Sequence, residues 1–297
     1  MESILIISPS GAINPEYIDG AVQRLQSWGY NVTISPHAYG EVGRFSGTDE
    51  ERLADLQAAL QDPSVDFILC SRGGYGLQRI IDKIDSVLLN VNRSTLIGFS
   101  DITALHELIT LHSPVSTLHG LMCKHIATLP DDSTALQLFR RALAREPITY
   151  TLPAHALNRL GTTQATLVGG NLSVLYGLQG TPYDLNHVID AQPEGVILFI
   201  EDICERHYHI DRMMNNLRMS GVLTRIKGLV VGQFTDCEAD QLMGCTIYDT
   251  IAQNVAAYDY PVLFDFPAGH VEDNRPLYLN HSATLTITED SSQLLQP

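Results

Sequence analysis

The sequence of 297 residues has few basic side chains and a single tryptophan, Trp28. Lys and Arg number 18 against 34 Asp and Glu, and no basic cluster provides the face that a nucleic-acid-binding protein needs to displace counterions. We therefore expect no nucleic-acid partner. The chain also has no run of about 20 apolar residues, so we expect no segment to span a membrane.

Two further absences concern targeting and redox chemistry. The N-terminal segment MESILIISPSG has a short apolar run with no Lys or Arg before it, which is a poor secretory signal and a good first strand. The five cysteines form no C-x-x-C pair, which predicts reduced packing thiols, no structural zinc and a cytoplasmic protein. Hydrophobic residues make up 44% of the chain, enough for a globular core.

Strands and helices alternate in the first half of the sequence. Apolar runs predict buried strands at residues 3–8, 65–70 and 95–99, with shorter strands at 31–35 and 115–119. Asn14 and Pro15 start a helix that ends at Gly29, and Thr48 with Glu51 forms a capping box for the next helix. A further helix is expected from 101 to about 111. This order predicts an α/β fold with a parallel sheet covered by helices on both faces.

The second half has its own set of predicted elements. We expect strands at 196–200, 229–231 and 262–266, and helices near 210–221 and 246–258. The segment around 145–165 contains two prolines and no helical stripe. We therefore predict an N-terminal domain at 1–148, a linker at 149–165 and a C-terminal domain at 166–297.

Ser100 follows the strand 95–99 directly and precedes a helix. This places its hydroxyl at the carboxyl edge of the predicted sheet and at the N-terminus of a helix, where backbone N–H groups can hold an oxyanion. The turn Gly98-Phe99-Ser100-Asp101 is similar to a nucleophile elbow without its second glycine. A simple helix cap would explain Ser100 equally well.

The segment Ser71-Arg72-Gly73-Gly74-Tyr75-Gly76 also follows a buried strand. Its glycines allow close approach of the backbone and positive φ angles. The order of residues fits neither a Walker loop nor a dinucleotide-binding loop. It is either an anion-binding loop beside Ser100 or a tight turn.

Glu201 and His270 are the acid and base candidates. Glu201 and Asp202 end the strand 196–200, where two carboxylates need partners or water. His270 lies in a loop after the strand 262–266 and could act as a base. Each residue alone has a structural explanation. His207 and His209 have no matching third ligand nearby, so we expect no metal site.

Together these segments resemble the LD-carboxypeptidase family, also called muramoyltetrapeptide carboxypeptidases. The similar motifs occur in order along nearly the whole chain, namely ISPS at 7–10, SRGGYG at 71–76, GFSDITALH at 98–106, GGNL at 169–172, IEDICERHYHIDRMMNNLRMSG at 200–221 and PAGHVEDNRPLYL at 267–279.

The resemblance implies a fold, a catalytic site and a reaction. The fold is an N-terminal α/β domain like class I glutamine amidotransferases with a smaller C-terminal α/β domain. Ser100, Glu201 and His270 form the implied triad, and the amides of Asp101 and Gly74 form the implied oxyanion hole. The implied reaction is hydrolysis of the terminal L,D-peptide bond of peptidoglycan tetrapeptides with release of D-alanine, in cell-wall recycling and without a cofactor or metal.

The resemblance also implies a muropeptide partner and a homodimer. The residues expected to bind substrate are Arg72, Tyr75, Asn171 and Arg275, and either arginine could pair with the terminal carboxylate. Two departures from the family pattern occur. Phe99 replaces a frequent tyrosine, and the run after His270 reads NRPLYLN, with Tyr278 and Asn280 in place of Pro and Gly.

Two other functions remain open at this point. Some family members cleave peptide–nucleotide antibiotics and use an aromatic residue on an added loop, whereas Trp28 lies on the first predicted helix. The chain could also hold a peptide without cleaving it. Neither the diamino acid of the substrate, nor the choice between free muropeptides and intact wall, nor the oligomeric state follows from these residues.

Overall fold

The chain divides into two compact units. The computed structural model describes residues 1–238 and 240–297. The first unit contains Met1–Arg140 and Arg275–Tyr278, and the second contains Arg141–Asn274 and Leu279–Pro297. The units are similar in length, and the chain passes between them more than once. Residues 275–278 thus belong to the first unit, whereas the sequence predicted one C-terminal domain over 166–297.

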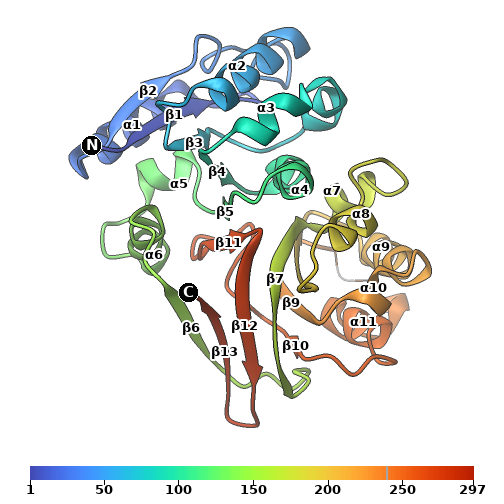
Figure 1. Cartoon of the computed structure of the whole chain (residues 1–297). Coiled ribbons are helices and arrows are strands. Elements are labelled where there is room, and N and C mark those ends of the chain that lie inside the picture. The colour runs from blue at the N-terminus through green and yellow to red at the C-terminus, as the bar shows by residue number, and fades with distance from the viewer. Residues whose placement is uncertain (239) are drawn as a thin grey trace. The chain divides into compact units, whose positions relative to one another are not determined.

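The first unit is built around a sheet with the strand order β11-β5-β4-β3-β1-β2. The pairs β2–β1, β1–β3, β3–β4 and β4–β5 are parallel (Figure 1). The short strand β11 extends this sheet beside β5, which explains why residues 275–278 leave the second unit. The strands are β1 (Ser3–Ile7), β2 (Asn31–Ile34), β3 (Phe67–Cys70), β4 (Thr95–Gly98), β5 (Thr117–His119) and β11 (Leu277–Leu279).

Helices cover both faces of this sheet. Figure 1 shows α1 and α5 on one side and α2, α3 and α4 on the other. Right-handed crossovers between the parallel strands require that α1 lies opposite to α2, α3 and α4. The helices are α1 (Pro15–Ser27), α2 (Asp49–Gln61), α3 (Ser86–Val91), α4 (Thr103–His112), α5 (Cys123–Thr128) and α6 (Thr134–Leu143), with short 3₁₀ turns η1 (Leu77–Arg79), η2 (Ile81–Lys83) and η3 (Ser100–Ile102).

The predicted helix starts are confirmed. Asn14 caps α1 by accepting a hydrogen bond from the Glu16 N–H, and Pro15 is the first helical residue. Thr48 and Glu51 form the capping box of α2 in both directions. These polar side chains satisfy the N–H groups that a helix start leaves without partners, so the sequence fixes both starts locally.

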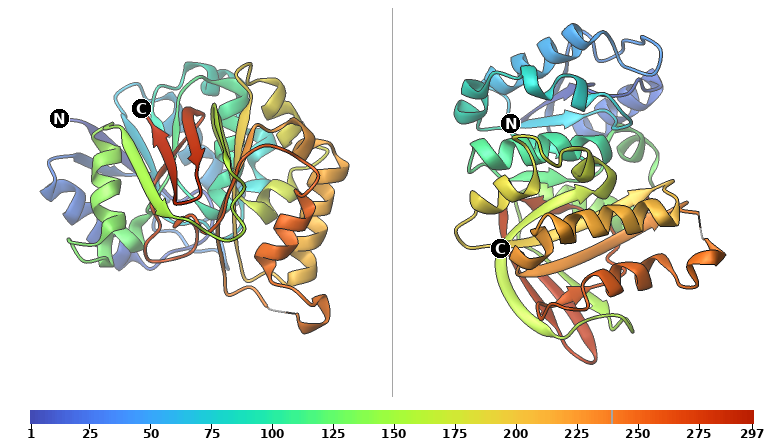
Figure 2. Two further views of the ribbon diagram at one scale, coloured as in Figure 1. Left: turned by 90° about the horizontal axis from the view of Figure 1, so that it is seen from below. Right: turned by 90° about the vertical axis from the view of Figure 1, so that its right-hand side faces the viewer.

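The second unit contains a larger sheet with the order β10-β9-β8-β7-β12-β13-β6. The strands β7 to β10 are parallel, while β12, β13 and β6 run antiparallel to their neighbours. Figure 2 shows β12 and β13 in red as the arms of a hairpin. The strands are β6 (Ile148–Pro153), β7 (Gly161–Asn171), β8 (Val196–Ile203), β9 (Gly228–Thr235), β10 (Val262–Leu263), β12 (His281–Ile287) and β13 (Ser291–Gln296).

Helices of the second unit pack around α9, which contacts α7, α10 and α11. As predicted, α9 buries an apolar stripe that includes Ile210, Met214 and Leu217. The helices are α7 (Leu172–Gly177), α8 (Leu185–Asp190), α9 (His207–Met219), α10 (Val222–Arg225) and α11 (Ile247–Asn254), with the turn η4 (Gln241–Met243).

The predicted linker at 149–165 is not a linker in the structure. It contains most of β6, which pairs with β13, and the beginning of β7, which pairs with β12. The prolines favoured a linker in the prediction. Pro153, however, is the last residue of an edge strand, where a missing N–H removes no hydrogen bond between strands. The partners of both strands come from the end of the chain, so no local pattern reveals the pairing.

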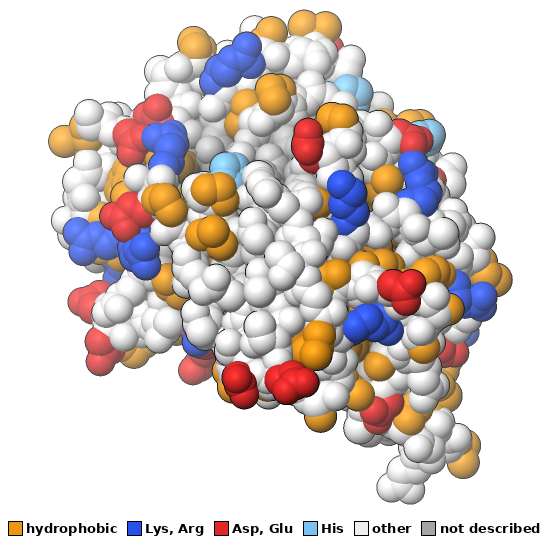
Figure 3. All heavy atoms as spheres, turned by 60° about the horizontal axis from the view of Figure 1, so that its bottom comes forward, with side chains coloured by type: hydrophobic (Ala, Val, Ile, Leu, Met, Phe, Trp, Pro, Cys, Tyr) orange, Lys and Arg blue, Asp and Glu red, His pale blue; other side chains and the backbone are white. Residues whose placement is uncertain are grey.

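Charged side chains of both signs are spread over the surface that Figure 3 shows. On this face, Lys and Arg side chains are scattered among Asp and Glu and do not gather into one basic patch. Among the helices of the described residues, none has the length and apolar character needed to cross a membrane.

Candidate active site

Ser100 sits on a strained turn between β4 and α4. Its φ angle is +67°, a left-handed conformation that is uncommon for a residue other than glycine. Such strain costs on the order of 1 kcal/mol and persists only where the surrounding structure enforces it. A sharp strand-to-helix turn with a positive φ is how a nucleophile elbow exposes its hydroxyl. The missing second glycine therefore has not prevented the elbow conformation.

The glycine loop 71–76 packs directly against Ser100. A Cβ atom placed on Gly73 would lie 2.8 Å from the Ser100 Cβ and 3.0 Å from the Phe99 carbonyl oxygen. Such distances are sterically forbidden, so only glycine lets the two loops approach this closely. The two loop motifs identified in the sequence are therefore neighbours in the first unit.

Two backbone amides of these loops, those of Gly74 and Asp101, make no hydrogen bond within the described residues. The Gly73 carbonyl accepts a hydrogen bond from the Gly11 N–H at 3.0 Å. In a trans peptide the N–H points opposite to the carbonyl, so the Gly74 N–H points away from Gly11. Across residues 1–238 and 240–297, neither the Gly74 N–H nor the Asp101 N–H has a hydrogen-bond acceptor.

His106 supports the strand that leads to Ser100. Its Nε2 lies 2.9 Å from the Gly98 carbonyl and its Nδ1 lies 2.8 Å from the Thr117 hydroxyl. Burial lowers the pKa of His106 to about 4, against the hydrogen bond to Gly98, which raises it. His106 is therefore a neutral structural histidine whose Nε2–H donates to Gly98, although it belongs to the same sequence motif as Ser100.

Glu201 and His270 form a pair in the second unit. Glu201 lies near the end of β8 and is fully buried, and its Oε2 is 2.7 Å from the His270 Nδ1. His270 follows β10 in a loop, as predicted. When Nδ1 donates to the carboxylate, Nε2 becomes the basic nitrogen of the ring.

The pKa of His270 is raised above its usual value. Burial acts to lower it, but the hydrogen bond and the negative charge of Glu201 outweigh burial, with a further contribution from Asp202. The imidazolium is thus stabilised at this position. An acid that orients a histidine and stabilises its protonated form is the arrangement that a general base needs.

Asp202 and Asn171 form a second polar group beside this pair. Asn171 Nδ2 donates to Asp202 Oδ1 at 3.0 Å, and the Ser173 N–H donates to Asp202 Oδ2 at 2.8 Å. Burial, and then the charge of Glu201, raise the pKa of Asp202 to about 7. Asn171 Oδ1 also caps α7 by accepting from the Val174 N–H. The sequence marked both acids as needing partners, but only the fold identifies those of Asp202.

The candidate substrate-binding residues of the first unit occupy different surroundings. Arg72 is exposed, and its Nη1 donates to the Ala12 carbonyl at 2.6 Å. Tyr75 is 43% exposed, with the guanidinium of Arg44 at 5.9 Å from its ring centre. Arg275 is half-buried at the start of the segment that leads into β11.

His207 and His209, the two histidines considered for a metal site, have other partners in the structure. They lie on α9, where His207 Nε2 contacts the Thr250 hydroxyl and His209 Nδ1 contacts Glu205 Oε2. In the part of the chain that the structure describes, no group of three or more His, Cys, Asp or Glu is arranged to hold a metal ion.

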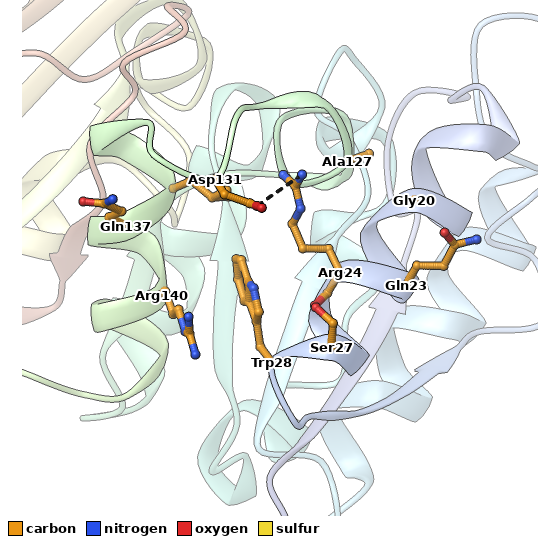
Figure 4. A pocket seen from close by; sticks show the side chains of 10 residues that line it. Gly20, Gln23, Arg24, Ser27, Trp28, Ala127, Asp131, Gln137 and Arg140 are labelled. Carbon is orange, nitrogen blue, oxygen red and sulfur yellow. Dashed lines mark hydrogen bonds and ion pairs between the residues drawn. The ribbon is translucent and has the colours of Figure 1, made fainter.

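Trp28 lines a surface pocket of about 600 Å³ together with Arg24 and Arg140 (Figure 4). The guanidinium of Arg140 lies 5.7 Å from the Trp28 ring centre, and Arg24 pairs with Asp131. Trp28 caps the C-terminus of α1, which precedes the start of β2. In a parallel sheet this is the amino edge, opposite to the carboxyl edge that carries Ser100.

Comparisons with known proteins agree with this geometry. Residues 4–120 match the model of the LD-carboxypeptidase N-terminal domain, and residues 164–285 match that of the C-terminal domain. A probable murein peptide carboxypeptidase of Bacillus subtilis is 31% identical over 98% of this chain and 91% of its own length.

Solved structures show the same fold. The muramoyltetrapeptide carboxypeptidase of Oxalobacter formigenes is 28% identical with a TM-score of 0.86, over 99% of this chain and 98% of the other. The microcin C7 self-immunity protein MccF also has a TM-score of 0.86, over 100% and 96% of the chains, but at 20% identity this likeness concerns the fold alone. The chain therefore belongs to the LD-carboxypeptidase family, and it is a hydrolase of the carboxypeptidase class.

Proposed function

We propose that this protein hydrolyses the terminal L,D-peptide bond of peptidoglycan tetrapeptides and releases D-alanine, as a cytoplasmic homodimer in cell-wall recycling. The observation that carries this proposal is the 2.7 Å contact between His270 Nδ1 and Glu201 Oε2 in a chain whose serine motif adopts an elbow. The names of the similar proteins, murein peptide and muramoyltetrapeptide carboxypeptidase, support the substrate class.

In the proposed mechanism, Ser100, His270 and Glu201 act as one triad. The Ser100 oxygen attacks the carbonyl of the last peptide bond, and His270 Nε2 accepts the hydroxyl proton and later delivers it to the leaving amine. Water then hydrolyses the acyl-enzyme with His270 as base, which regenerates the serine. The mechanism requires His270 Nε2 to reach the Ser100 oxygen during catalysis.

The amides of Asp101 and Gly74 are the proposed donors to the oxyanion. Both lack a hydrogen-bond acceptor among the described residues, which suits a site that donates to a developing charge. Removing one such donor typically lowers kcat by about 10²- to 10³-fold.

The test is product analysis with a defined tetrapeptide. Purified protein is incubated with a muropeptide tetrapeptide, and the products are followed by mass spectrometry. We expect loss of one alanine from the substrate and free D-alanine, and we expect Ser100→Ala to lower the rate roughly 10⁶-fold. Ser27→Ala, on the exposed end of α1, is the matched control and should match the wild type. Equal rates for Ser100→Ala and wild type would remove the serine mechanism.

A carboxypeptidase must also recognise a free terminal carboxylate, and Arg72 and Arg275 are the proposed partners. Loss of a charge-assisted hydrogen bond should raise KM about 10-fold or more, with a smaller effect on kcat. Arg93→Ala, at the amino end of β4, serves as the control. An unchanged KM in both Arg72→Ala and Arg275→Ala would exclude both residues from this role. Tyr75 and Asn171 remain proposed contacts to the peptide.

Cleavage of a peptide–nucleotide antibiotic is the competing proposal, and the structure does not favour it. Trp28, the only tryptophan of the chain, caps α1 at the amino edge of the first sheet. Incubation with a peptidyl nucleotide in parallel with the tetrapeptide separates the two substrates. A non-catalytic peptide-binding protein would bind the tetrapeptide without releasing alanine and without labelling by a fluorophosphonate.

A further inference from the structure

Two loops at the carboxyl edge of the first sheet are held together by two charged side chains. One loop follows β1 and includes Pro9 and Ser10, and the other follows β3 and includes the Gly76–Leu77 peptide. Arg52 of α2 and Asp101 beside the nucleophile each contact both loops. Both charged residues are buried, with 1% and 3% exposure.

A single peptide unit lies between the two charges. The Gly76 carbonyl accepts a hydrogen bond from Arg52 Nη1 at 3.1 Å, and the N–H of the same peptide, on Leu77, donates to Asp101 Oδ2 at 3.0 Å. The peptide is therefore oriented from both sides, with its carbonyl toward the guanidinium and its N–H toward the carboxylate. Gly76 has a φ of +151°, and a Cβ there would lie 2.8 Å from Arg52 Nη1, so a larger residue would strain the backbone and displace the guanidinium from this contact.

The loop after β1 is held by the same two side chains. The Pro9 carbonyl accepts from Arg52 Nη1 at 2.7 Å, and the Ser10 hydroxyl donates to Asp101 Oδ2. Asp49 also binds the other terminal nitrogen of Arg52. Buried charges are costly unless they are paired and hydrogen-bonded. Arg52 is therefore compensated by Asp49 and by two backbone carbonyls, and Asp101 by the Ser10 hydroxyl and the Leu77 N–H, so both loops contribute to holding the two charges.

The position of this arrangement connects it to catalysis. Asp101 follows the strained Ser100 directly, and its own amide is one proposed oxyanion donor. The other proposed oxyanion donor is the amide of Gly74, which lies two residues before the Gly76–Leu77 peptide. Any movement of the 76–77 peptide would change the position of Gly74 relative to Asp101. Misplacement of a catalytic group by about 1 Å can lower a rate about 100-fold.

We propose that Arg52 and Asp101, through their side chains, are positioning residues that fix the geometry of the oxyanion hole. This inference rests on the proposed serine mechanism. The two side chains do not touch the substrate; they act through the backbone of the loops 9–10 and 76–77.

The experiment compares Arg52→Met, Asp101→Asn and their double variant with Asp55→Asn as a matched control. Asp55 is a buried carboxylate on the same helix as Arg52, and it binds His37, which follows β2. For each variant, kcat and KM are measured with the tetrapeptide, Ser100 labelling is timed with a fluorophosphonate, and the thermal midpoint is recorded.

We expect Arg52→Met and Asp101→Asn each to lower kcat about 100-fold with KM changed less than about threefold, and to slow labelling of Ser100. Because both side chains orient one peptide, the double variant should be little worse than the poorer single variant. Asp55→Asn should lower the thermal midpoint without lowering kcat. Arg52→Lys, which keeps the charge and can donate to both carbonyls, should recover part of kcat.

Two results would overturn the inference. Variants of Arg52 and Asp101 that lower the thermal midpoint but keep kcat would show a purely structural role. A fall in kcat of the same size in Asp55→Asn would show that loss of any buried ion in this unit has this effect. Failure of the serine mechanism itself is distinguished by Ser100→Ala, which would then retain activity.

Discussion

His270 Nδ1 lies 2.7 Å from Glu201 Oε2, and this contact is the one hydrogen bond that the Glu201 side chain makes within the described residues. Glu201 is fully buried, and its second oxygen, Oε1, has no partner there. The buried Glu201 side chain therefore has His270 as its hydrogen-bond partner, and the raised pKa of His270 depends on Glu201. Neither residue can be changed without a measurable effect on the other.

Glu201→Gln should lower kcat and move the pH dependence. We expect a loss of about 10⁴-fold in kcat, because the histidine loses its orienting acid. The active base is neutral His270, so wild-type activity should rise with pH through a pKa above 6.5. In Glu201→Gln, burial still lowers the pKa of His270, while the carboxylate that raised it is gone. The rise of activity with pH should therefore move to lower pH. A pH–rate profile measures both kcat and the pKa of the base. An unchanged pKa in the variant would contradict the assignment of His270 and Glu201 as base and acid.

His270→Ala should destabilise the protein because it leaves Glu201 buried without a partner. Removing one member of a buried pair typically costs about 3–5 kcal/mol. The folded pKa of His270 is raised, so the pair contributes most below pH 6.5 and loses this contribution as the pH rises through the folded pKa. Urea unfolding at pH 6 and pH 8 should therefore show the larger cost at pH 6. The double variant with Glu201→Gln should recover stability; failure to recover would argue against the pair.

Gly73→Ala should abolish most activity, whereas alanine at a glycine with open space around it should leave activity unchanged. The new Cβ would lie 2.8 Å from the Ser100 Cβ, so the glycine loop or the nucleophile must move. We expect a fall in kcat of at least about 100-fold. Gly29→Ala is the comparison, because Gly29 has a φ of +93° and open space around it. It should cost about 1 kcal/mol of stability and leave kcat unchanged. Similar kcat values for the two variants would refute the close packing.

His106→Gln should change the acid sensitivity of the protein. Burial lowers the pKa of His106 to about 4, below its usual 6.5. The folded state thus resists protonation, and stability that is full above pH 6.5 is lost as the pH falls toward 4. Glutamine can still donate to the Gly98 carbonyl but does not titrate. Between pH 7 and pH 4.5 the wild type should lose more unfolding free energy than the variant, and equal losses would disprove this role.

Much of the site could be anticipated because its residues lie in local patterns. A buried strand that runs into a helix places the next residue at the carboxyl edge of a sheet, which is where Ser100 lies. Glu201 and His270 were found in the same way, after strands. Their contact was not derivable from spacing, since 69 residues separate them. It was expected through the family resemblance.

The fold was less accessible where strands pair across long stretches of sequence. The segment 149–165 looked like a linker because its prolines suggested one, yet β6 pairs with the C-terminal strand β13. The strand β11 extends the first sheet although the segments before residue 275 and after residue 278 belong to the second unit. A short stretch of sequence does not show which strands, distant along the chain, will form hydrogen bonds with each other.

The sequence by itself determined the helix starts and the buried parallel strands, because capping, apolar runs and turn residues act over a few neighbouring positions. The same local patterns placed Ser100, Glu201 and His270 after strands, and the family resemblance is what joined them into a proposed triad. Only the tertiary structure decided which residues support them. Arg52 and Asp101 are 49 positions apart and look like ordinary charges of a helix and a turn. They share one peptide unit because folding brings α2, β3 and β4 to the same edge, where each buried charge must find hydrogen bonds.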